Sequence, residues 1–297
     1  MIEKLAKNLI NLKKEFASDY DGSSQIQEFI PLSNSDLFPI DKEELKLLHE
    51  FAEKNPIYYN SFEKSLGGIP CIVYEGDVNK YWLNSIQHNS SHAPFSPTWI
   101  MSAYIMTLFA KEYGYSQIID IGSGDGRIAY CGKVIGVESY SIELDNQLTD
   151  LQKSLNTNID FNPYCFDATQ FDYSSLNLTK PLFFIGGLAQ MGGVELATGV
   201  LKKIESEFNL LHNSGWIFAG TVSKKYRADP KNMSGWGSFI ENNSLKLVQN
   251  VTLPTAWSFK ELDETQYIFS KFHSNSNPNE VHKSQCSWTY SSAWIER

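Results

Sequence analysis

The chain has 297 residues, 42% of them hydrophobic and 20% charged, which is globular composition and excludes a disordered or fibrous protein. Its 34 acidic residues against 25 Lys and Arg give a net charge of −9, which disfavours nucleic-acid binding because an acidic surface repels phosphates. No apolar run reaches the roughly 18 residues that span a bilayer, and residues 1–16 interleave charged and apolar positions, unlike a signal peptide. We therefore expect a cytoplasmic protein without a membrane partner.

The cysteines are spaced far apart, and none belongs to a Cys-x-x-Cys motif or a Cys/His cluster. This spacing predicts neither a metal site nor a disulfide framework. Cys131 falls in a predicted helix and Cys165 in a predicted strand, so we expect both to be packing residues.

Residues 1–94 are predicted to form a mainly helical cap. Apolar residues recur at helical spacing in residues 1–16, and a second helix is expected after Asp41, which suits a helix N-cap. Between residues 57 and 86 the sequence is aromatic and β-branched around a Gly-Gly pair, which indicates a strand or hairpin.

The body of the protein is expected over residues 95–272, beginning with a helix. Ser96 is a candidate N-cap, Pro97 suits a first helical turn, and Gly114 ends the apolar periodicity. Residues 273–297 are rich in Asn and Ser and are expected to form a flexible or docking tail.

Strand and helix patterns then alternate along the body. Strands are predicted at 117–121, 139–144, 162–168, 181–187 and 215–222. Helices are predicted after Gly126, through Leu155, and over the apolar positions from Leu196 to Leu211, and two final strands at 244–253 and 265–272 have no helix between them. Such alternation predicts an α/β fold with a doubly wound, mostly parallel seven-stranded sheet and an antiparallel edge strand.

A glycine-rich turn follows the first of these strands, in the segment Asp120-Ile-Gly-Ser-Gly-Asp-Gly-Arg127. Glycines at this place allow a tight turn and close approach of a ligand, while the start of the next helix favours an anionic group. The spacing GxGxG differs from the dinucleotide fingerprint GxGxxG because Arg127 takes the next position, and no triphosphate loop is present. The turn is therefore predicted to be a cofactor loop, without a dinucleotide signature.

Two acidic residues occupy the ends of the next two predicted strands. Glu143 lies 19 residues after Gly124, where a carboxylate can accept both hydroxyls of a ribose, and Asp167 closes the third strand. Either residue alone could equally be a solvated carboxylate at a strand end. Together with the glycines they mark the carboxyl edge of the sheet, where open parallel sheets bind ligands.

This constellation resembles the class I S-adenosylmethionine-dependent methyltransferases, over about residues 95–272. The resemblance implies S-adenosyl-L-methionine as cofactor, with Glu143 on the ribose hydroxyls and Asp120 on the ammonium side of the methionine. The other residues that it implies at the cofactor are Gly122, Ser123, Gly124, Asp167, Ala168 and Gly186, with Asp167 near the adenine amino group.

The sequence is also similar to the DOT1-like and small archaeal protein lysine methyltransferases. In that branch a segment with Pro-Thr precedes the helix before the glycine motif, and Phe95-Ser-Pro-Thr98 stands in that place here. The resemblance implies that Phe95 and Thr98 close over the methionine end of the cofactor and that the acceptor is an amine. A helix cap alone would explain the same residues equally well.

The acceptor and the catalytic residues stay open at the level of sequence, and no metal ligand is predicted. Residues 185–190 read Ile-Gly-Gly-Leu-Ala-Gln instead of the [DN]PPY of methyltransferases acting on adenine, cytosine or glutamine nitrogens, so those acceptors lose support. Candidates for the acceptor pocket are 186–190 and the loop 223–237, with Tyr226 and Trp236. We expect a protein or small-molecule methyl acceptor. One alternative is a non-catalytic scaffold that binds the same cofactor. Another is an NAD-dependent oxidoreductase, which the glycine spacing of the loop disfavours.

Overall fold

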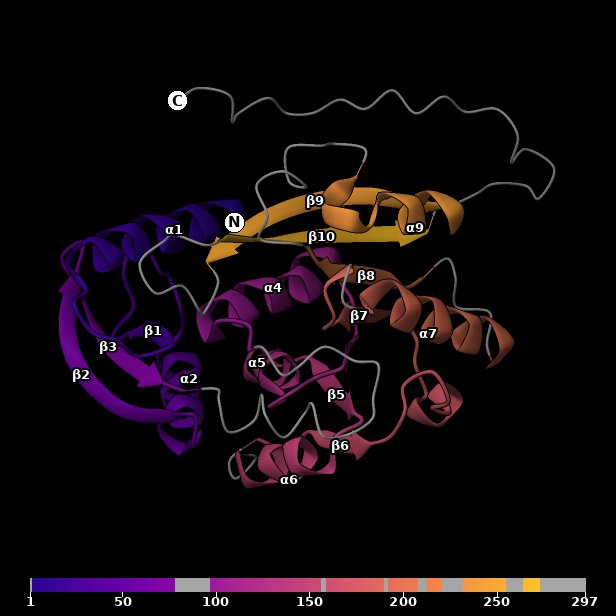
Figure 1. The fold of residues 1–297 in the computed structure, drawn as a ribbon, viewed down its shortest axis with the longest axis horizontal. Coiled ribbons are helices and arrows are strands. Elements are labelled where there is room, and N and C mark those ends of the chain that lie inside the picture. The colour runs from indigo at the N-terminus through magenta and orange to yellow at the C-terminus, as the bar shows by residue number, and fades with distance from the viewer. Residues whose placement is uncertain are drawn as a thin grey trace.

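The structure is a computed structural model and contains two β-sheets (Figure 1). It describes residues 2–77, 97–155, 159–189, 192–207, 213–220, 232–254 and 264–272. Phe95, Tyr226 and the predicted tail at 273–297 lie outside the described residues.

The N-terminal region combines two helices with a three-stranded antiparallel sheet of order β1-β3-β2. Its elements are α1 (Ile2–Asp19), β1 (Ile26–Pro31), α2 (Lys42–Lys54), β2 (Tyr58–Leu66) and β3 (Ile69–Gly76). The predicted helices and hairpin are confirmed, and the Asp41 side chain caps α2 by accepting a hydrogen bond from the Glu43 backbone N–H. The sequence did not predict β1, because every residue of this strand is buried and its sequence does not alternate between polar and apolar.

The body is built on a seven-stranded sheet of order β6-β5-β4-β7-β8-β10-β9. Its strands are β4 (Gln117–Ile121), β5 (Glu138–Glu143), β6 (Asn162–Cys165), β7 (Pro181–Ile185), β8 (Gly215–Ala219), β9 (Leu245–Pro254) and β10 (Glu264–Phe272). The first five of these are parallel, whereas β10 runs antiparallel to β8 and to β9. The predicted α/β fold, with a mostly parallel seven-stranded sheet and an antiparallel pair at one edge, is therefore confirmed.

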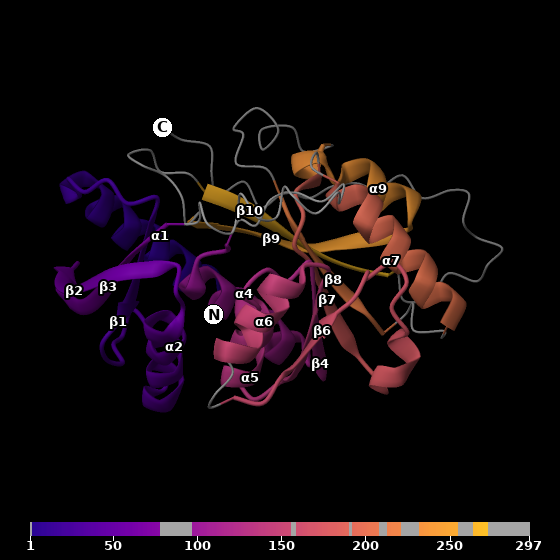
Figure 2. The ribbon, with the colours of Figure 1, turned by 60° about the horizontal axis from the view of Figure 1, so that its bottom comes forward.

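Helices cover both faces of this sheet (Figure 2). One face carries α4 (Ile100–Tyr113), α5 (Arg127–Val134) and α6 (Asn146–Leu155), and the other carries α7 (Gly193–Glu207) and α9 (Gly237–Asn242). Successive strand residues alternate between the two cores: Leu182 and Phe184 belong to the first, Phe183 and Ile185 to the second.

The start of α4 differs from the sequence prediction. The helix begins at Ile100, so Pro97 precedes the helix instead of occupying its first turn, and Ser96 lies outside the described residues. The backbone N–H of Ile100 donates to Glu28 of β1 at 2.8 Å. A side chain 72 residues away therefore satisfies the helix start that a local cap was expected to satisfy. The predicted end is confirmed, since Gly114 adopts the left-handed conformation.

The N-terminal region shares its hydrophobic core with the body. Buried side chains of α1 and α2 form one continuous cluster with those of α4 and α5. Figure 1 shows this region beside α4 and α5, with β5 to β8 beyond them. Within the described residues, no helix is long and apolar enough to cross a membrane.

Candidate functional site

The glycine-rich loop lies between β4 and α5, at the point where the strand order of the sheet reverses. β4 has β5 on one side and β7 on the other, and in such sheets the crevice beyond the carboxyl ends of these strands is the usual ligand site. Gly122, Gly124 and Gly126 have φ values of 67°, 57° and 76°. L-residues with side chains rarely adopt these angles, so the loop geometry depends on glycine at all three positions.

Polar contacts with β5 and α6 hold the glycine-rich loop. The Gly122 N–H donates to the Ile142 carbonyl at 2.9 Å. The side-chain amide of Gln152, on α6, donates to the Ser123 hydroxyl at 2.9 Å and to the Gly124 carbonyl at 2.7 Å. The hydroxyl of Ser123, a predicted cofactor-binding residue, is thus engaged by Gln152 within the loop.

Glu143 ends β5 and lies against the loop. Its Oε2 accepts a hydrogen bond from the Gly124 N–H at 2.7 Å, and its Oε1 accepts one from the Asp145 N–H at 3.0 Å. Burial raises the pKa of Glu143 above its usual range, against the lowering by these backbone donors. The fold therefore brings together the carboxylate and the loop that the sequence places 19 residues apart. A carboxylate has lone pairs for further donors beyond these two.

Asp120 lies beneath the loop near the end of β4 and is only 1% exposed. The Ala129 N–H, in α5, donates to its Oδ2 at 3.4 Å. Desolvation by burial raises the pKa of Asp120 to about 8, and the neighbouring carboxylates of Glu143 and Asp125 act in the same direction. The group that the resemblance places on the ammonium side of the cofactor is thus a buried carboxyl whose pKa lies well above that of an exposed aspartate.

Asp167 and Ala168 follow β6, two and three residues after the strand ends. Asp167 is half-buried, and its Oδ1 accepts hydrogen bonds from the backbone N–H and the hydroxyl of Thr169 at 2.9 and 2.8 Å. Ala168 is buried, and its carbonyl accepts a hydrogen bond from the Tyr173 hydroxyl at 2.9 Å. Asp167 thus forms a local turn at the same sheet edge as Glu143.

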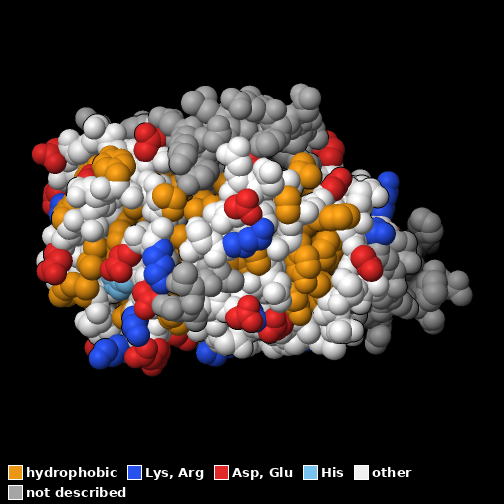
Figure 3. All heavy atoms as spheres, turned by 90° about the horizontal axis from the view of Figure 1, so that it is seen from below, with side chains coloured by type: hydrophobic (Ala, Val, Ile, Leu, Met, Phe, Trp, Pro, Cys, Tyr) orange, Lys and Arg blue, Asp and Glu red, His pale blue; other side chains and the backbone are white. Residues whose placement is uncertain are grey.

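Two exposed apolar side chains beside these carboxylates were missed by the sequence reasoning. Leu144 follows Glu143 and is 41% exposed, and Phe166 precedes Asp167 and is 49% exposed. Figure 3 shows hydrophobic side chains reaching the surface over the N-terminal region and over the body, among charged groups. Because β5 and β6 are adjacent, both side chains belong to the strand ends that carry the acidic residues. In the sequence, the only indication of their role was that each stands next to an acidic residue that was itself predicted to bind the cofactor.

Gly186 follows β7 and packs directly on the loop. Its N–H donates to the Ile121 carbonyl at 2.8 Å, and a Cβ atom there would lie 2.4 Å from the Gly122 carbonyl oxygen. The structure thus gives this predicted cofactor residue a packing reason to be glycine.

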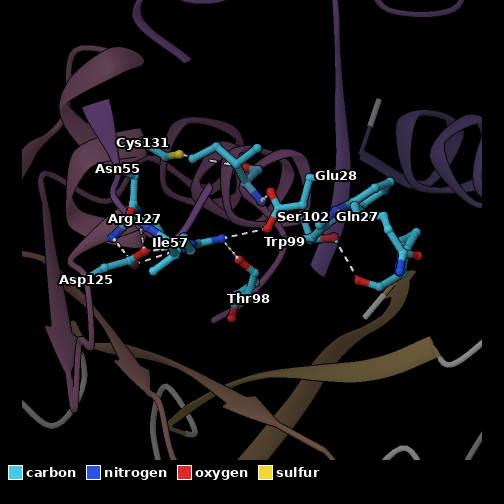
Figure 4. A network of polar contacts seen from close by, with 12 residues as sticks. Gln27, Glu28, Asn55, Ile57, Thr98, Trp99, Ser102, Asp125, Arg127 and Cys131 are labelled. Carbon is cyan, nitrogen blue, oxygen red and sulfur yellow. Dashed lines mark hydrogen bonds and ion pairs between the residues drawn. The ribbon is translucent and has the colours of Figure 1, made fainter. Parts of the chain in front are cut away.

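A buried charged network around Arg127 was also missed (Figure 4). Arg127 pairs with Asp125 at 2.5 Å and with Glu28 of β1 at 2.9 Å. Thr98 is half-buried, and its carbonyl accepts a further hydrogen bond from Arg127. The signal in the sequence was weak, because Asp125 and Arg127 belong to the glycine motif while Glu28 lies 99 residues from Arg127.

Two expectations about side chains are wrong. Trp236, a candidate for the acceptor pocket, is fully buried, and its ring centroid lies 4.5 Å from that of Phe218. Its indole N–H donates to the Ala219 carbonyl at 2.8 Å. It therefore belongs to the core. Cys165, expected to be a packing residue, is exposed at the end of β6, whereas Cys131 is buried, as a packing residue would be. Among the described residues, no cluster of three His, Cys, Asp or Glu could hold a metal ion.

The sequence matches no protein-family model and no curated protein. Similar solved structures include a protein of Pyrococcus horikoshii assigned as an RNA methyltransferase, 12% identical, covering 65% of this chain and 96% of that one with a TM-score of 0.44. Magnesium protoporphyrin IX methyltransferase of Synechocystis PCC 6803 is 10% identical, with coverages of 59% and 83% and a TM-score of 0.41. Ribosomal protein L11 methylase of Lactobacillus delbrueckii subsp. bulgaricus is 14% identical, with coverages of 59% and 79% and a TM-score of 0.38. At such low similarity, function has to be inferred from this chain's own residues.

Proposed function

We propose that this protein is an S-adenosyl-L-methionine-dependent methyltransferase. The observation that carries the proposal is the 2.7 Å hydrogen bond between the Gly124 N–H and Glu143, at the carboxyl ends of the two adjacent strands β4 and β5. A nucleoside with an amino-acid arm needs a carboxylate for its ribose diol and a glycine-rich backbone against the arm. Here the carboxylate of Glu143 and the glycine-rich backbone at Gly124 are in direct hydrogen-bond contact.

The neighbouring residues fit the remaining parts of such a cofactor. Leu144 and Phe166 offer exposed apolar side chains to a flat base, beside Asp167 for its amino group. Asp120 is a buried carboxyl with a raised pKa, and the positive charge of a bound ammonium group would favour its ionised form. S-adenosylmethionine supplies an electrophilic methyl group. The residues named here would bind and orient the cofactor, so that the nucleophile, the methyl group and the sulfur lie in line and no dedicated base is needed.

An NAD-dependent oxidoreductase is the less favoured enzyme. The third glycine of the dinucleotide fingerprint gives close packing of helix on strand, and Arg127 occupies that position here. Its side chain is 2% exposed and enters the N-terminal region.

The acceptor that we propose is an amine nitrogen, in first place a lysine of another protein. The support is the similarity of Phe95-Ser-Pro-Thr98 and of the GSGDGR motif to the lysine-methylating branch, together with a net charge of −9 that would steer a basic substrate. A lysine must lose its proton before it attacks the methyl group, and an apolar entrance promotes this loss by desolvation.

Calorimetry tests the cofactor assignment directly. Titrations of the full chain with S-adenosylmethionine, S-adenosylhomocysteine and NAD should give binding of the first two and none of NAD. Binding of NAD with no binding of S-adenosylmethionine would overturn the proposal in favour of an oxidoreductase.

A labelled-methyl assay on cell extract tests the acceptor. We expect label in protein, on lysine, at a rate that rises from neutral pH to about 9, because an exposed lysine titrates near about 10.4 and burial lowers this value. Label only in small molecules would identify the alternative acceptor class. Cofactor binding without transfer to any fraction would favour the non-catalytic scaffold.

A further inference from the structure

The ion pairs of Arg127 lie between the N-terminal region and the glycine-rich loop. Arg127, Asp125 and Glu28 are 2%, 1% and 0% exposed, so this is a fully enclosed group of charges. Arg127 Nε also donates to Asp125 Oδ1 at 2.9 Å, in addition to the two ion pairs. Asn55, at the end of α2, donates its side-chain amide to Asp125 Oδ2 at 2.8 Å.

The network joins segments that are remote in sequence. Figure 4 shows Glu28 and Asn55, both from the N-terminal region, reaching Arg127 and Asp125. Asp125 and Arg127 are the residues on either side of Gly126, which has a φ of 76°. Contacts made by the N-terminal region therefore act on the part of the loop from which α5 begins.

Stability alone is a poor explanation for such a network. A buried ion pair loses so much hydration that well-packed apolar residues often serve as well or better, whereas charge-assisted hydrogen bonds are directional and fix geometry. Within the body, the loop is held by Gln152 of α6 and by the Ile142 carbonyl of β5. The N-terminal region supplies further holding contacts.

We propose that Glu28 and Asn55 are positioning residues of the cofactor site. They act through Arg127 and Asp125 to hold the glycine-rich loop in its binding conformation, so the N-terminal region completes the site and does more than cover it. This inference rests on the proposed function in that the loop is taken to bind S-adenosylmethionine.

The test compares two network variants with a matched control in the full chain. Glu28→Gln keeps the shape of the side chain and removes its charge, and Asn55→Asp places a like charge beside Asp125. The control Tyr74→Phe removes a buried hydroxyl that bonds His49 at 2.8 Å in the same region. Each variant is first checked for folding by circular dichroism, and S-adenosylhomocysteine affinity and hydrogen exchange of the unliganded loop are then measured.

We expect both network variants to weaken S-adenosylhomocysteine binding by about tenfold or more, equivalent to about 1.4 kcal/mol. Amides at 123–127 should exchange faster, while those of β4 keep their protection. Tyr74→Phe should lower the melting temperature and leave affinity and loop exchange within about twofold. Unchanged affinity and loop exchange in Glu28→Gln and Asn55→Asp would overturn the inference.

The same design separates this inference from the proposed function. If the wild-type chain binds neither S-adenosylmethionine nor S-adenosylhomocysteine, the proposed function fails. Hydrogen exchange, which needs no ligand, then still decides the positioning role: faster exchange at 123–127 in the network variants supports it, and unchanged exchange refutes it.

Discussion

The two faces of the seven-stranded sheet differ in what they bury. The face under α4, α5 and α6, which the N-terminal region also covers, contains Asp120 and the network of Arg127, Asp125 and Glu28. The opposite face, under α7 and α9, is an aromatic core in which the rings of Phe183, Trp216, Phe218 and Trp236 follow one another at 4.7, 6.2 and 4.5 Å between centroids.

This difference follows from the alternation of strand residues. Ile119 and Ile121 of β4 face the aromatic core, so Asp120 between them faces α5. Ile142 of β5 likewise faces the aromatic core and Glu143 the other side. The face under α4, α5 and α6 therefore carries the contacts of Asp120 and Arg127, whereas the opposite face is mainly an aromatic and aliphatic core. The two faces should respond differently to substitution and to pH.

The largest expected effect is that of Arg127→Met, on the charged face. It removes the common partner of two buried carboxylates, so we expect about 3–5 kcal/mol of destabilisation in urea unfolding at pH 8. Burial already raises the pKa of Glu28, and loss of Arg127 removes its main lowering influence. The folded variant then binds protons more readily than the unfolded chain, so the deficit should shrink at pH 5. A deficit below about 1 kcal/mol at both pH values would show that the faces do not differ in this way.

Glu143→Ala should weaken cofactor binding by about 1.5–3 kcal/mol, since it removes charge-assisted hydrogen bonds to the ribose. Calorimetry with S-adenosylhomocysteine measures the effect. Glu138→Ala is the matched control, because Glu138 begins the same strand, at its other end, and pairs with Lys133 at 2.7 Å. Equal affinity in both variants would remove the ribose role of Glu143.

The raised pKa of Asp120 predicts a pH dependence of stability. An acid whose folded-state pKa is about 8 holds its proton in the folded chain and loses it on unfolding between about pH 4 and 8. Stability should therefore fall as pH rises through this window, by at most about 1.4 kcal/mol per pH unit for this group. Asp120→Asn should show a flatter profile in urea unfolding from pH 5 to 8. If stability depends on pH equally in the wild type and in Asp120→Asn, Asp120 is not the group that holds a proton in the folded chain.

The smallest expected effect is that of Ile268→Val in the aromatic core. Ile268 is fully buried on β10, and removal of one methyl group there should cost about 0.5–1.5 kcal/mol. No titrating group is changed, so the loss in urea unfolding should be equal at pH 5 and pH 8. A loss that varies with pH, like that of Arg127→Met, would remove the contrast between the faces.

Elements with a local apolar pattern could be predicted from the sequence, whereas elements that depend on Glu28 could not. Apolar periodicity placed the strands of the seven-stranded sheet and the helices α4, α5, α6 and α7, whereas α9 was not predicted. It failed for β1, a strand buried at every residue although it contains Glu28, and for the start of α4, which is satisfied by that same Glu28. In both cases a charged side chain has its partner far away in the sequence.

The candidate site divides in the same manner. The Gly-Ser-Gly-Asp-Gly loop and its position before a helix were readable, because the left-handed backbone of such a turn requires glycine. Other features of the site depend on which strands become neighbours and could not be read from the sequence. They are the packing of Gly186 on the Gly122 carbonyl, the burial of Trp236 beside Phe218 and the exposure of Cys165.

The sequence by itself determined the α/β fold of the body and the place of the loop with Glu143 at the carboxyl edge, because strand periodicity and turn stereochemistry are local properties. Only the tertiary structure decided that Glu28 and Asn55 reach the loop through Arg127 and Asp125. Pairing between buried charges depends on contacts across 70 to 99 residues, which no local pattern encodes. Burial makes such pairs obligatory, since an isolated charge in the core is too costly to be left without a partner.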